Sequence, residues 1–284
     1  MIDQGHRVPV RAAAVAGSFY PGRPGELRRM IDRFVGSSKP DARALAVIVP
    51  HAGYVYSGSV AGAVFASVIL PETFVILAPA HRMQRPVFAV MTEGFWETPL
   101  GTVPVDGRLA ASIQRRCPAM THDPEAHAQE HSLEVQIPFL QYFRKEISIV
   151  PIIVSSRASL EDLGSMGEAV AAAIRDDGRD VLVVASTDMS HYISASKAKL
   201  LDGRAIERIL ALDASGLVKT VFEHDISMCG VLPAAAAVKA AVSLGATRAE
   251  LVRYANSGEV TGDDREVVGY AGLRLLGGDA RTVR

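Results

Sequence analysis

Two histidines directly follow apolar runs, in equivalent positions. His51 comes after residues 44–50, and His81 comes after residues 73–80. Both runs are short for a helix and rich in β-branched residues, so we expect them to form buried parallel strands. Open α/β sheets bind ligands outside the carboxyl ends of such strands, which places both imidazoles at one edge of the sheet. Imidazole suits iron, copper, nickel and zinc, so this edge could hold a metal.

A third apolar run, residues 180–185, leads to Asp188 and His191. Two histidines and a carboxylate form the facial arrangement of non-haem Fe(II) oxygenases, which makes Asp188 a candidate ligand. In the alternative interpretation, each of these side chains only caps its strand or makes local hydrogen bonds. The equivalent placement of His51 and His81 favours one shared polar site.

A second pattern competes with the first. His127 to His131 reads H-x-x-E-H, the inverted zincin motif. On one helix the two histidines would share a face, and Glu130 would be a general base. The alternative is a solvated helix start, because Pro124 and the charges around it place His127 before the helix or in its first turn. His131 and Glu134 flank an otherwise apolar helix, so we expect them to lie in the crevice.

Cys229 immediately precedes Gly230 and an apolar segment, residues 231–244. A thiol near a helix N-terminus has a lowered pKa, which would suit a nucleophile or a soft metal ligand. A small buried residue at a tight turn is the alternative. The other cysteine, Cys117, is expected to be structural. Two cysteines make no disulfide framework, which favours a reducing, cytosolic compartment.

Composition excludes several classes of function. The 284 residues carry 30 Lys+Arg against 31 Asp+Glu, so nothing indicates nucleic acid or an acidic membrane surface as a partner. Residues 1–7 lack the apolar core of a signal peptide, and no stretch approaches the ~18 apolar residues of a membrane span. We therefore expect a cytoplasmic protein.

Apolar runs alternate with helical patterns along the chain, and two final strands, residues 249–255 and 266–276, are expected to pair antiparallel. This order predicts one three-layer α/β/α domain over residues 1–284, with a core of about 12–276 and a mixed, mostly parallel sheet. Pro138 is expected to kink or stop a helix, and Pro151 to place its strand near an edge.

Several of these stretches form a series along the chain. In order they are Ala16-Gly17-Ser18-Phe19-Tyr20-Pro21, Pro50-His51-Ala52-Gly53-Tyr54-Val55-Tyr56-Ser57-Gly58, Ala78-Pro79-Ala80-His81, Glu130-His131-Ser132-Leu133-Glu134, Ser186-Thr187-Asp188-Met189-Ser190-His191, Cys229-Gly230 and Gly269-Tyr270-Ala271-Gly272. The series resembles the Memo-like family, whose bacterial and archaeal members are labelled AmmeMemoRadiSam system protein B.

The resemblance implies a fold like that of class III extradiol dioxygenases, which use a non-haem Fe(II). It also implies that a metal, iron or copper in members that have one, is held by the residues matching His51, His81 and Cys229. Asp188 then becomes a pocket acid in place of the third ligand. The zincin interpretation loses support, because His127 is not in the family motif. Some members have a second histidine where this chain has Arg82, which either binds an anionic substrate or points to solvent.

These observations favour a metal-dependent redox enzyme that uses Fe(II), with copper or zinc as alternatives. His191 and His131 would act as acid and base, and Asp188 would orient one of them. The resemblance further implies a radical SAM protein and an AMMECR-type protein as partners, beside an unknown small-molecule or peptide ligand. A second hypothesis is a non-catalytic metal- or peptide-binding module. A third is a zinc hydrolase built on His127, Glu130 and His131.

Overall fold

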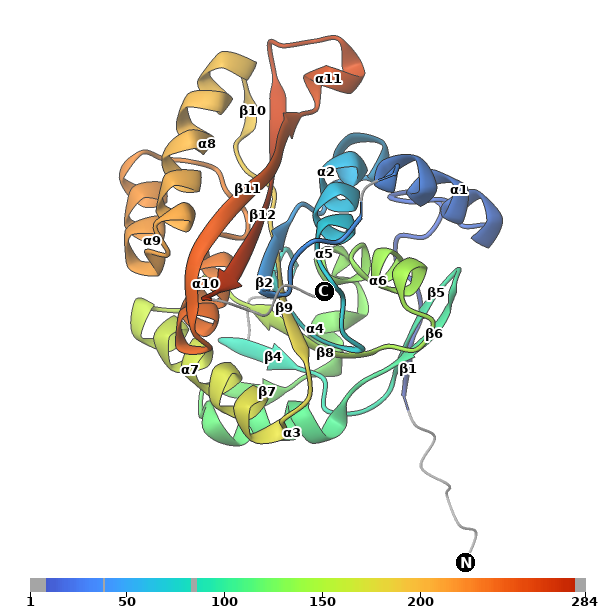
Figure 1. Cartoon of the computed structure of the whole chain (residues 1–284), viewed down its shortest axis with the longest axis vertical. Coiled ribbons are helices and arrows are strands. Elements are labelled where there is room, and N and C mark those ends of the chain that lie inside the picture. Colours follow the sequence, from blue (N-terminus) through green and yellow to red (C-terminus); the bar gives the residue numbers. More distant parts are fainter. Residues whose placement is uncertain (1–8, 38, 83–85, 279–284) are drawn as a thin grey trace, which may run out of the picture.

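The structure, a computed structural model, describes residues 9–37, 39–82 and 86–278 (Figure 1). Residues 1–7, in which no signal peptide is expected, lie outside these ranges, and the expected domain of residues 1–284 is longer than they are. Nine strands form one sheet in the order β10-β12-β2-β9-β3-β8-β4-β7, with β11 paired to β12. They are β2 (Ala44–Val49), β3 (Thr73–Pro79), β4 (Phe88–Val90), β7 (Met120–His122), β8 (Ser148–Val154), β9 (Val181–Ser186), β10 (His191–Ile193), β11 (Ala246–Asn256) and β12 (Val267–Gly277).

The four central strands, β2, β9, β3 and β8, are parallel. Nearly all their residues are buried, because both faces of the sheet are covered, and this explains their continuous apolar sequences. Antiparallel pairing occurs where β12 meets β2 and β11, and where β4 meets β8. The predicted mixed sheet and its C-terminal antiparallel pair are confirmed.

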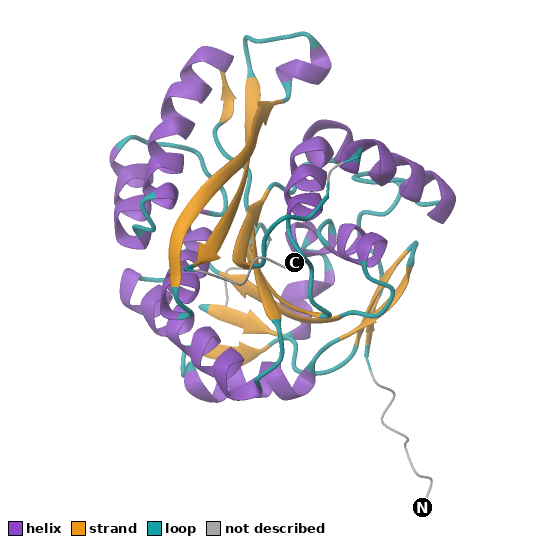
Figure 2. Cartoon of the chain, viewed as in Figure 1, coloured by secondary structure: helices purple, strands orange, loops and turns teal. Residues whose placement is uncertain are grey.

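Helices cover both faces of the sheet (Figure 2). One face carries α3 (Gly107–Arg116), α7 (Leu160–Asp177), α8 (Ala195–Leu210), α9 (Ala214–Glu223) and α10 (Val231–Ser243); the other carries α1 (Pro24–Val35), α2 (Tyr54–Ser67) and α6 (Ile137–Phe143). Alternate residues of β2 supply the two cores, since Ala46 and Ile48 belong to the first and Val47 and Val49 to the second. The α/β class is therefore as predicted.

The alanine-rich helix α10 packs between α7 and the central strands. Ten of its 13 residues are apolar and buried, and Lys239 and Val242 lie on the side that reaches solvent. Its small side chains allow this close packing. At its N-terminus, Gly230 donates its backbone N–H to Thr187 Oγ1 at 2.9 Å. Cys229, two residues before the first residue of α10, is thereby held beside the end of β9.

The position of β8 corrects one expectation. Pro151 does not mark an edge, because β8 lies between β3 and β4. The short strand β4 pairs with β8 only as far as Ile152, so at Pro151 that side of β8 has no strand partner. The missing N–H is tolerated there for this reason. Pro138 acts as predicted: α5 (His131–Glu134) stops, and α6 restarts with Pro138 in its first turn.

The remaining elements are short. A three-stranded sheet joins β1 (Val10–Arg11), β5 (Phe95–Thr98) and β6 (Gly101–Pro104), and α4 (Pro124–Ala128) and α11 (Gly258–Thr261) are single turns. Within the described ranges, no helix combines the length and apolar character needed to cross a membrane.

The N-terminal arm, residues 9–20, is fastened to α5 by a buried ion pair between Arg11 and Glu134. The Arg11 guanidinium also donates to the His127 and Glu130 carbonyls, at 3.1 and 2.9 Å. Glu134 accepts the Tyr20 hydroxyl at 2.5 Å. It also accepts backbone N–H groups of the arm. The expectation that Glu134 lies in the crevice is therefore wrong, because its carboxylate faces the arm.

Replacing Arg11 with methionine is expected to lower the free energy of unfolding by about 3 kcal/mol or more, because it leaves the Glu134 carboxylate buried without its cation. Urea unfolding followed by circular dichroism measures the change. Arg43→Met is the matched control. Arg43 pairs with Asp180 on the protein surface, and such exposed ion pairs contribute about 0–1 kcal/mol to the free energy of unfolding. Equal losses in the two variants would contradict the prediction.

Candidate metal centre

His51 follows β2 and is almost fully buried, at 2% exposure. Its Nδ1 lies 2.9 Å from Ser186 Oγ. That hydroxyl donates its proton to the Ser132 carbonyl at 2.7 Å and accepts an N–H of Gln136 at 2.8 Å. A hydroxyl has one proton, so Ser186 must accept from His51. The proton of His51 is thus on Nδ1, and its Nε2 presents a lone pair toward Cys229.

His81 follows β3. Strand β9 lies between β3 and β2 and is parallel to both, so His81 and His51 lie at the same end of the central strands. Its backbone N–H donates to Glu130 Oε2 at 2.7 Å, and its Nδ1 lies 2.8 Å from Glu130 Oε1. A carboxylate accepts hydrogen bonds, so Nδ1 of His81 is also the protonated nitrogen. A carboxylate in this position fixes the tautomer and raises the basicity of the other nitrogen in known metal sites.

Cys229 approaches from the loop between α9 and α10. Its Sγ lies 3.3 Å from His51 Nε2 and accepts the Asp188 backbone N–H at 3.3 Å. One candidate ligand atom each of His51, His81 and Cys229 lies within 4.8 Å of the others. The two imidazole rings are 5.2 Å apart. The structure thus brings together the three residues that the family resemblance implies, and their role as metal ligands stays a prediction.

The protonation states at this centre follow from burial. Burial holds the pKa of His51 well below its usual range, and the nearby histidines lower it further, so the ring is neutral at pH 7. Burial and the neighbouring Asp188 raise the pKa of the Cys229 thiol to about 12. The lowered thiol pKa expected near a helix N-terminus is therefore wrong, because burial outweighs the helix. A bound cation would favour the thiolate.

Asp188 supports the backbone of His51. Its Oδ1 accepts the backbone N–H groups of His51 and Ala52, at 2.8 and 3.3 Å, and its Oδ2 lies 4.0 Å from His51 Nε2. Burial raises the pKa of Asp188 to about 6, against these hydrogen bonds. The two candidate ligand sets in the described part of the chain, His51–His81–Cys229 and His81–Glu130–His131, both omit Asp188.

His131 and His191 flank the centre. The His131 ring stacks on His81 at 4.6 Å, and burial lowers its pKa to about 4, with the charges of His81 and Arg82 acting in the same direction. His191 is partly exposed; its Nδ1 donates to the Ser227 carbonyl at 2.8 Å, which leaves Nε2 as the basic nitrogen. Arg82 is exposed.

The zincin geometry is absent from residues 124–134. His127 belongs to α4, whereas Glu130 caps α5 and His131 begins it, so the three share no helix face. His127 is fully buried, with its ring nitrogens 2.8 and 3.2 Å from the carbonyl oxygens of Asp123 and Pro151. The expectation of a common face is wrong, because the chain turns between His127 and Glu130.

Glu130 has a different task from the general base expected of the zincin motif. Burial would raise the pKa of its carboxyl, but the hydrogen bonds and charge of His81, with the Ser132 amide, lower it to about 2. Glu130 is thus a permanent anion that orients His81.

Sequence reasoning missed Asp202, a buried carboxylate on α8. It accepts the Ser190 backbone N–H at 2.9 Å and the Tyr254 hydroxyl at 2.7 Å. Gly269 lies against it, so closely that a Cβ there would come within 2.1 Å of Asp202 Oδ2. Asp202 thereby holds the segment that carries Asp188 and His191. The glycine in the Gly269-Tyr270 motif was the available signal.

Asp202→Asn is expected to gain stability relative to the wild type as pH rises. Burial raises the pKa of Asp202, so the folded state favours the neutral acid, and the stability this gives below pH ~4 is lost as pH rises through the folded pKa. Asparagine cannot ionise. The difference in unfolding free energy should grow by at most ~1.4 kcal/mol per pH unit and then level off. Urea titrations between pH 4 and 8 test this, and a flat difference would contradict it.

Comparison with known proteins shows which family the chain belongs to. The sequence model of the Memo-like proteins matches residues 11–274. The chain belongs to the Memo-like family. A MEMO1 family protein of Methanothermobacter thermautotrophicus is 43% identical over 279 residues, covering 93% of this chain and 99% of that protein. Relatives from Methanopyrus kandleri and Aquifex aeolicus are 42% and 40% identical, covering 93% and 94% of this chain and 98% and 99% of theirs.

Among solved structures, an uncharacterised protein from Escherichia coli K12 has a similar fold, with a TM-score of 0.53 and 18% sequence identity. The similarity covers 81% of this Memo-like chain and 99% of that one. At this identity the likeness shows the fold alone. The kinship with extradiol dioxygenases stays a prediction.

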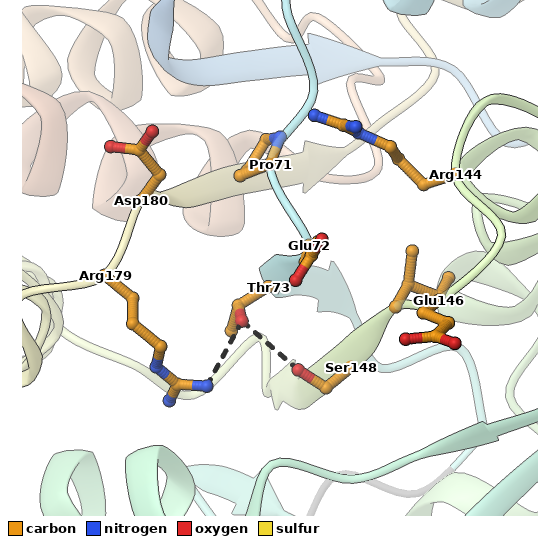
Figure 3. A pocket seen from close by; sticks show the side chains of 9 residues that line it. Pro71, Glu72, Thr73, Arg144, Glu146, Ser148, Arg179 and Asp180 are labelled. Atoms are coloured by element: carbon orange, nitrogen blue, oxygen red, sulfur yellow. Dashed lines mark hydrogen bonds between the residues drawn. The ribbon is translucent and has the colours of Figure 1, made fainter.

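A cavity of about 450 Å³ lies at the opposite, amino ends of β3, β8 and β9 (Figure 3). Its two arginines already have partners. Arg179 pairs with Asp106 and Asp177, and Arg144 donates to the Leu70 carbonyl at 2.7 Å. Because it lies at the amino ends of the strands, the cavity is separated from the candidate metal centre by the length of the strands.

Proposed function

We propose that this Memo-like protein binds a redox-active metal through His51, His81 and Cys229 and uses it in a metal-dependent redox reaction. The proposal takes Fe(II) as the metal, with copper or zinc as alternatives. One observation carries it: both imidazoles are held in the tautomer that presents Nε2, and a sulfur lies beside them. Two imidazoles and a thiol suit iron, copper and zinc.

The hydrogen bonds behind the ligands support the same proposal. Glu130 holds His81, and Ser186 with Gln136 holds His51, as outer partners do in known metal sites. Three protein ligands leave coordination positions open, as catalytic sites require. When bound, the metal would supply Lewis-acid and electron-transfer chemistry.

The surrounding side chains can move protons and fix geometry. His131, neutral at pH 7, can take up a proton beside Glu130, whose Oε1 lies 3.4 Å from its Nδ1. His191 presents Nε2 from the more open side. Asp188 positions His51 through its backbone. Arg82 could attract an anionic group.

Oxygen consumption tests the proposal. Protein purified without oxygen and loaded with Fe(II) should consume O2 with at least one member of a panel of catechols and phenols. His51→Ala should bind no iron and consume none. Iron-loaded wild-type protein that consumes no O2 with the whole panel would overturn the redox function.

A non-catalytic metal- or peptide-binding module is the second candidate. Exposed aromatic side chains near the centre favour it: Tyr192, next to His191, is 73% exposed at φ 56°, and Tyr56 is 42% exposed. The family resemblance supplies the proposed partners, a radical SAM protein and an AMMECR-type protein. Pull-down with His51→Ala tests whether the metal takes part, because unchanged capture would exclude metal-mediated binding.

A cytoplasmic location is also part of the proposed function. The free thiols of Cys117 and Cys229 support it, because disulfides are rare in that compartment.

A further inference from the structure

An apolar cavity of about 310 Å³ adjoins the candidate metal centre. We call it the Cys229 pocket. Cys229 is one of its lining residues, and the others are mainly apolar, including Val154, Val221, Ile226, Met228, Val231 and Leu232. These six side chains are almost completely buried within the protein. The cavity therefore lies beside one proposed ligand and not on a distant surface.

The pocket and the centre share their walls. Ala80, which directly precedes His81, lines the pocket at the end of β3. On the other side, the loop after α9 contributes Ile226 and Met228 to the pocket. The residue between them, Ser227, receives the hydrogen bond from His191. Residues of one loop thus bound the apolar space, anchor His191 and supply the sulfur.

The size and chemistry of the pocket indicate what fits it. An apolar cavity of ~150 Å³ is large enough for benzene, so this one has room for a ring with a substituent of several carbons. Among its lining residues, all of which the structure describes, Asp225 alone is charged. A sugar or an anionic group placed against the six buried apolar side chains would lose hydrogen bonds to water and find few polar groups to replace them, since the other polar lining residues, Ser156 and Asp225, are exposed.

We propose that the Cys229 pocket receives the apolar part of the substrate, an aryl or short alkyl substituent, while the reacting polar group lies at the metal centre. This rests on the proposed function and names its substrate class. Substrate affinity should then depend on the length of the apolar substituent. Burying one methylene is worth ~0.8 kcal/mol, which corresponds to about a fourfold gain in affinity per methylene.

The test uses 4-methyl-, 4-propyl- and 4-butylcatechol as probes, with anaerobic calorimetry on the Fe(II)-loaded protein and the matching 4-alkylphenols on the metal-free protein. Affinity should rise by about 60-fold from methyl to butyl, fourfold for each of the three added methylenes. Val221→Phe, which fills the pocket, should abolish this rise, and Leu232→Ala should move the optimum to longer chains. Val242→Phe makes the same change on the exposed face of α10 and should behave as the wild type. Metal content, measured in every variant, should stay at the wild-type level.

The possible failures can be told apart. Metal-loaded protein that binds catechols with no dependence on chain length would overturn the inference and leave the metal centre standing. The inference is also overturned if Val221→Phe folds, holds metal and keeps the full dependence. Protein that takes up no metal, yet binds alkylphenols with the expected dependence, would overturn the proposed function and support the apolar ligand class.

Discussion

Cys229→Ser is expected to reduce the metal content of anaerobically purified protein by at least tenfold. The sulfur lies 3.3 Å from His51 Nε2, on the side from which the lone pairs of the two histidines are accessible. A serine hydroxyl is a poor ligand for soft or borderline metals, since it does not become an anion near neutral pH. Elemental analysis of wild type and variant, purified side by side, measures the loss.

Asp188→Asn is the matched comparison and decides which residue is the third ligand. Asparagine keeps an oxygen for the backbone N–H groups of His51 and Ala52, so the loop should hold its shape. If Cys229 is the ligand, this variant should retain most of the metal. Loss of metal from Asp188→Asn, with retention in Cys229→Ser, would make the carboxylate the ligand and contradict the prediction.

Gly230→Ala is expected to destabilise the protein by roughly 3 kcal/mol, at the upper end of the usual cost of overpacking. A Cβ at this position would lie 2.4 Å from the Ser186 carbonyl oxygen and 2.5 Å from Thr187 Cβ. Ser186 ends the central strand β9, and Thr187, the next residue, is held by the hydrogen bond of its N–H to the Val49 carbonyl, so neither atom can move aside easily. The start of α10 must shift instead, and Cys229 with it.

Urea unfolding and metal content together measure this effect. Gly203→Ala, within α8, is the matched control, because an added Cβ there meets nothing within 4 Å. Alanine in a helix interior should stabilise that variant by about 0.5–1 kcal/mol. Equal stability of the two variants, or full metal content in Gly230→Ala, would show that the close approach is unimportant.

The parts of the fold that depend on local pattern could be predicted from the sequence. Apolar runs ending at His51 and His81 placed both residues correctly, because buried parallel strands have a distinctive composition. The final strands predicted at residues 249–255 and 266–276 correspond to β11 and β12. The place of Pro151 could not be predicted in the same way, since it depends on how far the short strand β4 extends along its neighbour.

The site itself was predictable only in part. The position of Cys229 before a helix already made it a possible soft metal ligand, and the family resemblance joined it to His51 and His81. Its raised pKa depends on the burial and the carboxylate that the fold brings to it. Glu130 and Glu134 are only four residues apart, but their carboxylates bind different parts of the chain. Only these distant partners distinguish the two residues. Glu134 meets Arg11, and Glu130 meets His81. Contacts between segments so far apart leave no periodic trace in one sequence.

The short helix α5 makes long-range contacts through side chains at both of its ends. Glu130, at its start, holds the imidazole of His81, and Glu134, at its finish, holds the first strand of the chain. Arg11 touches both, because its guanidinium also reaches the Glu130 carbonyl. Arg11 and the arm around it, residues 9–20, therefore support the candidate metal centre through α5. Deleting this arm, or displacing it with a bulky tag, would loosen His81, because Glu130 would lose its own support.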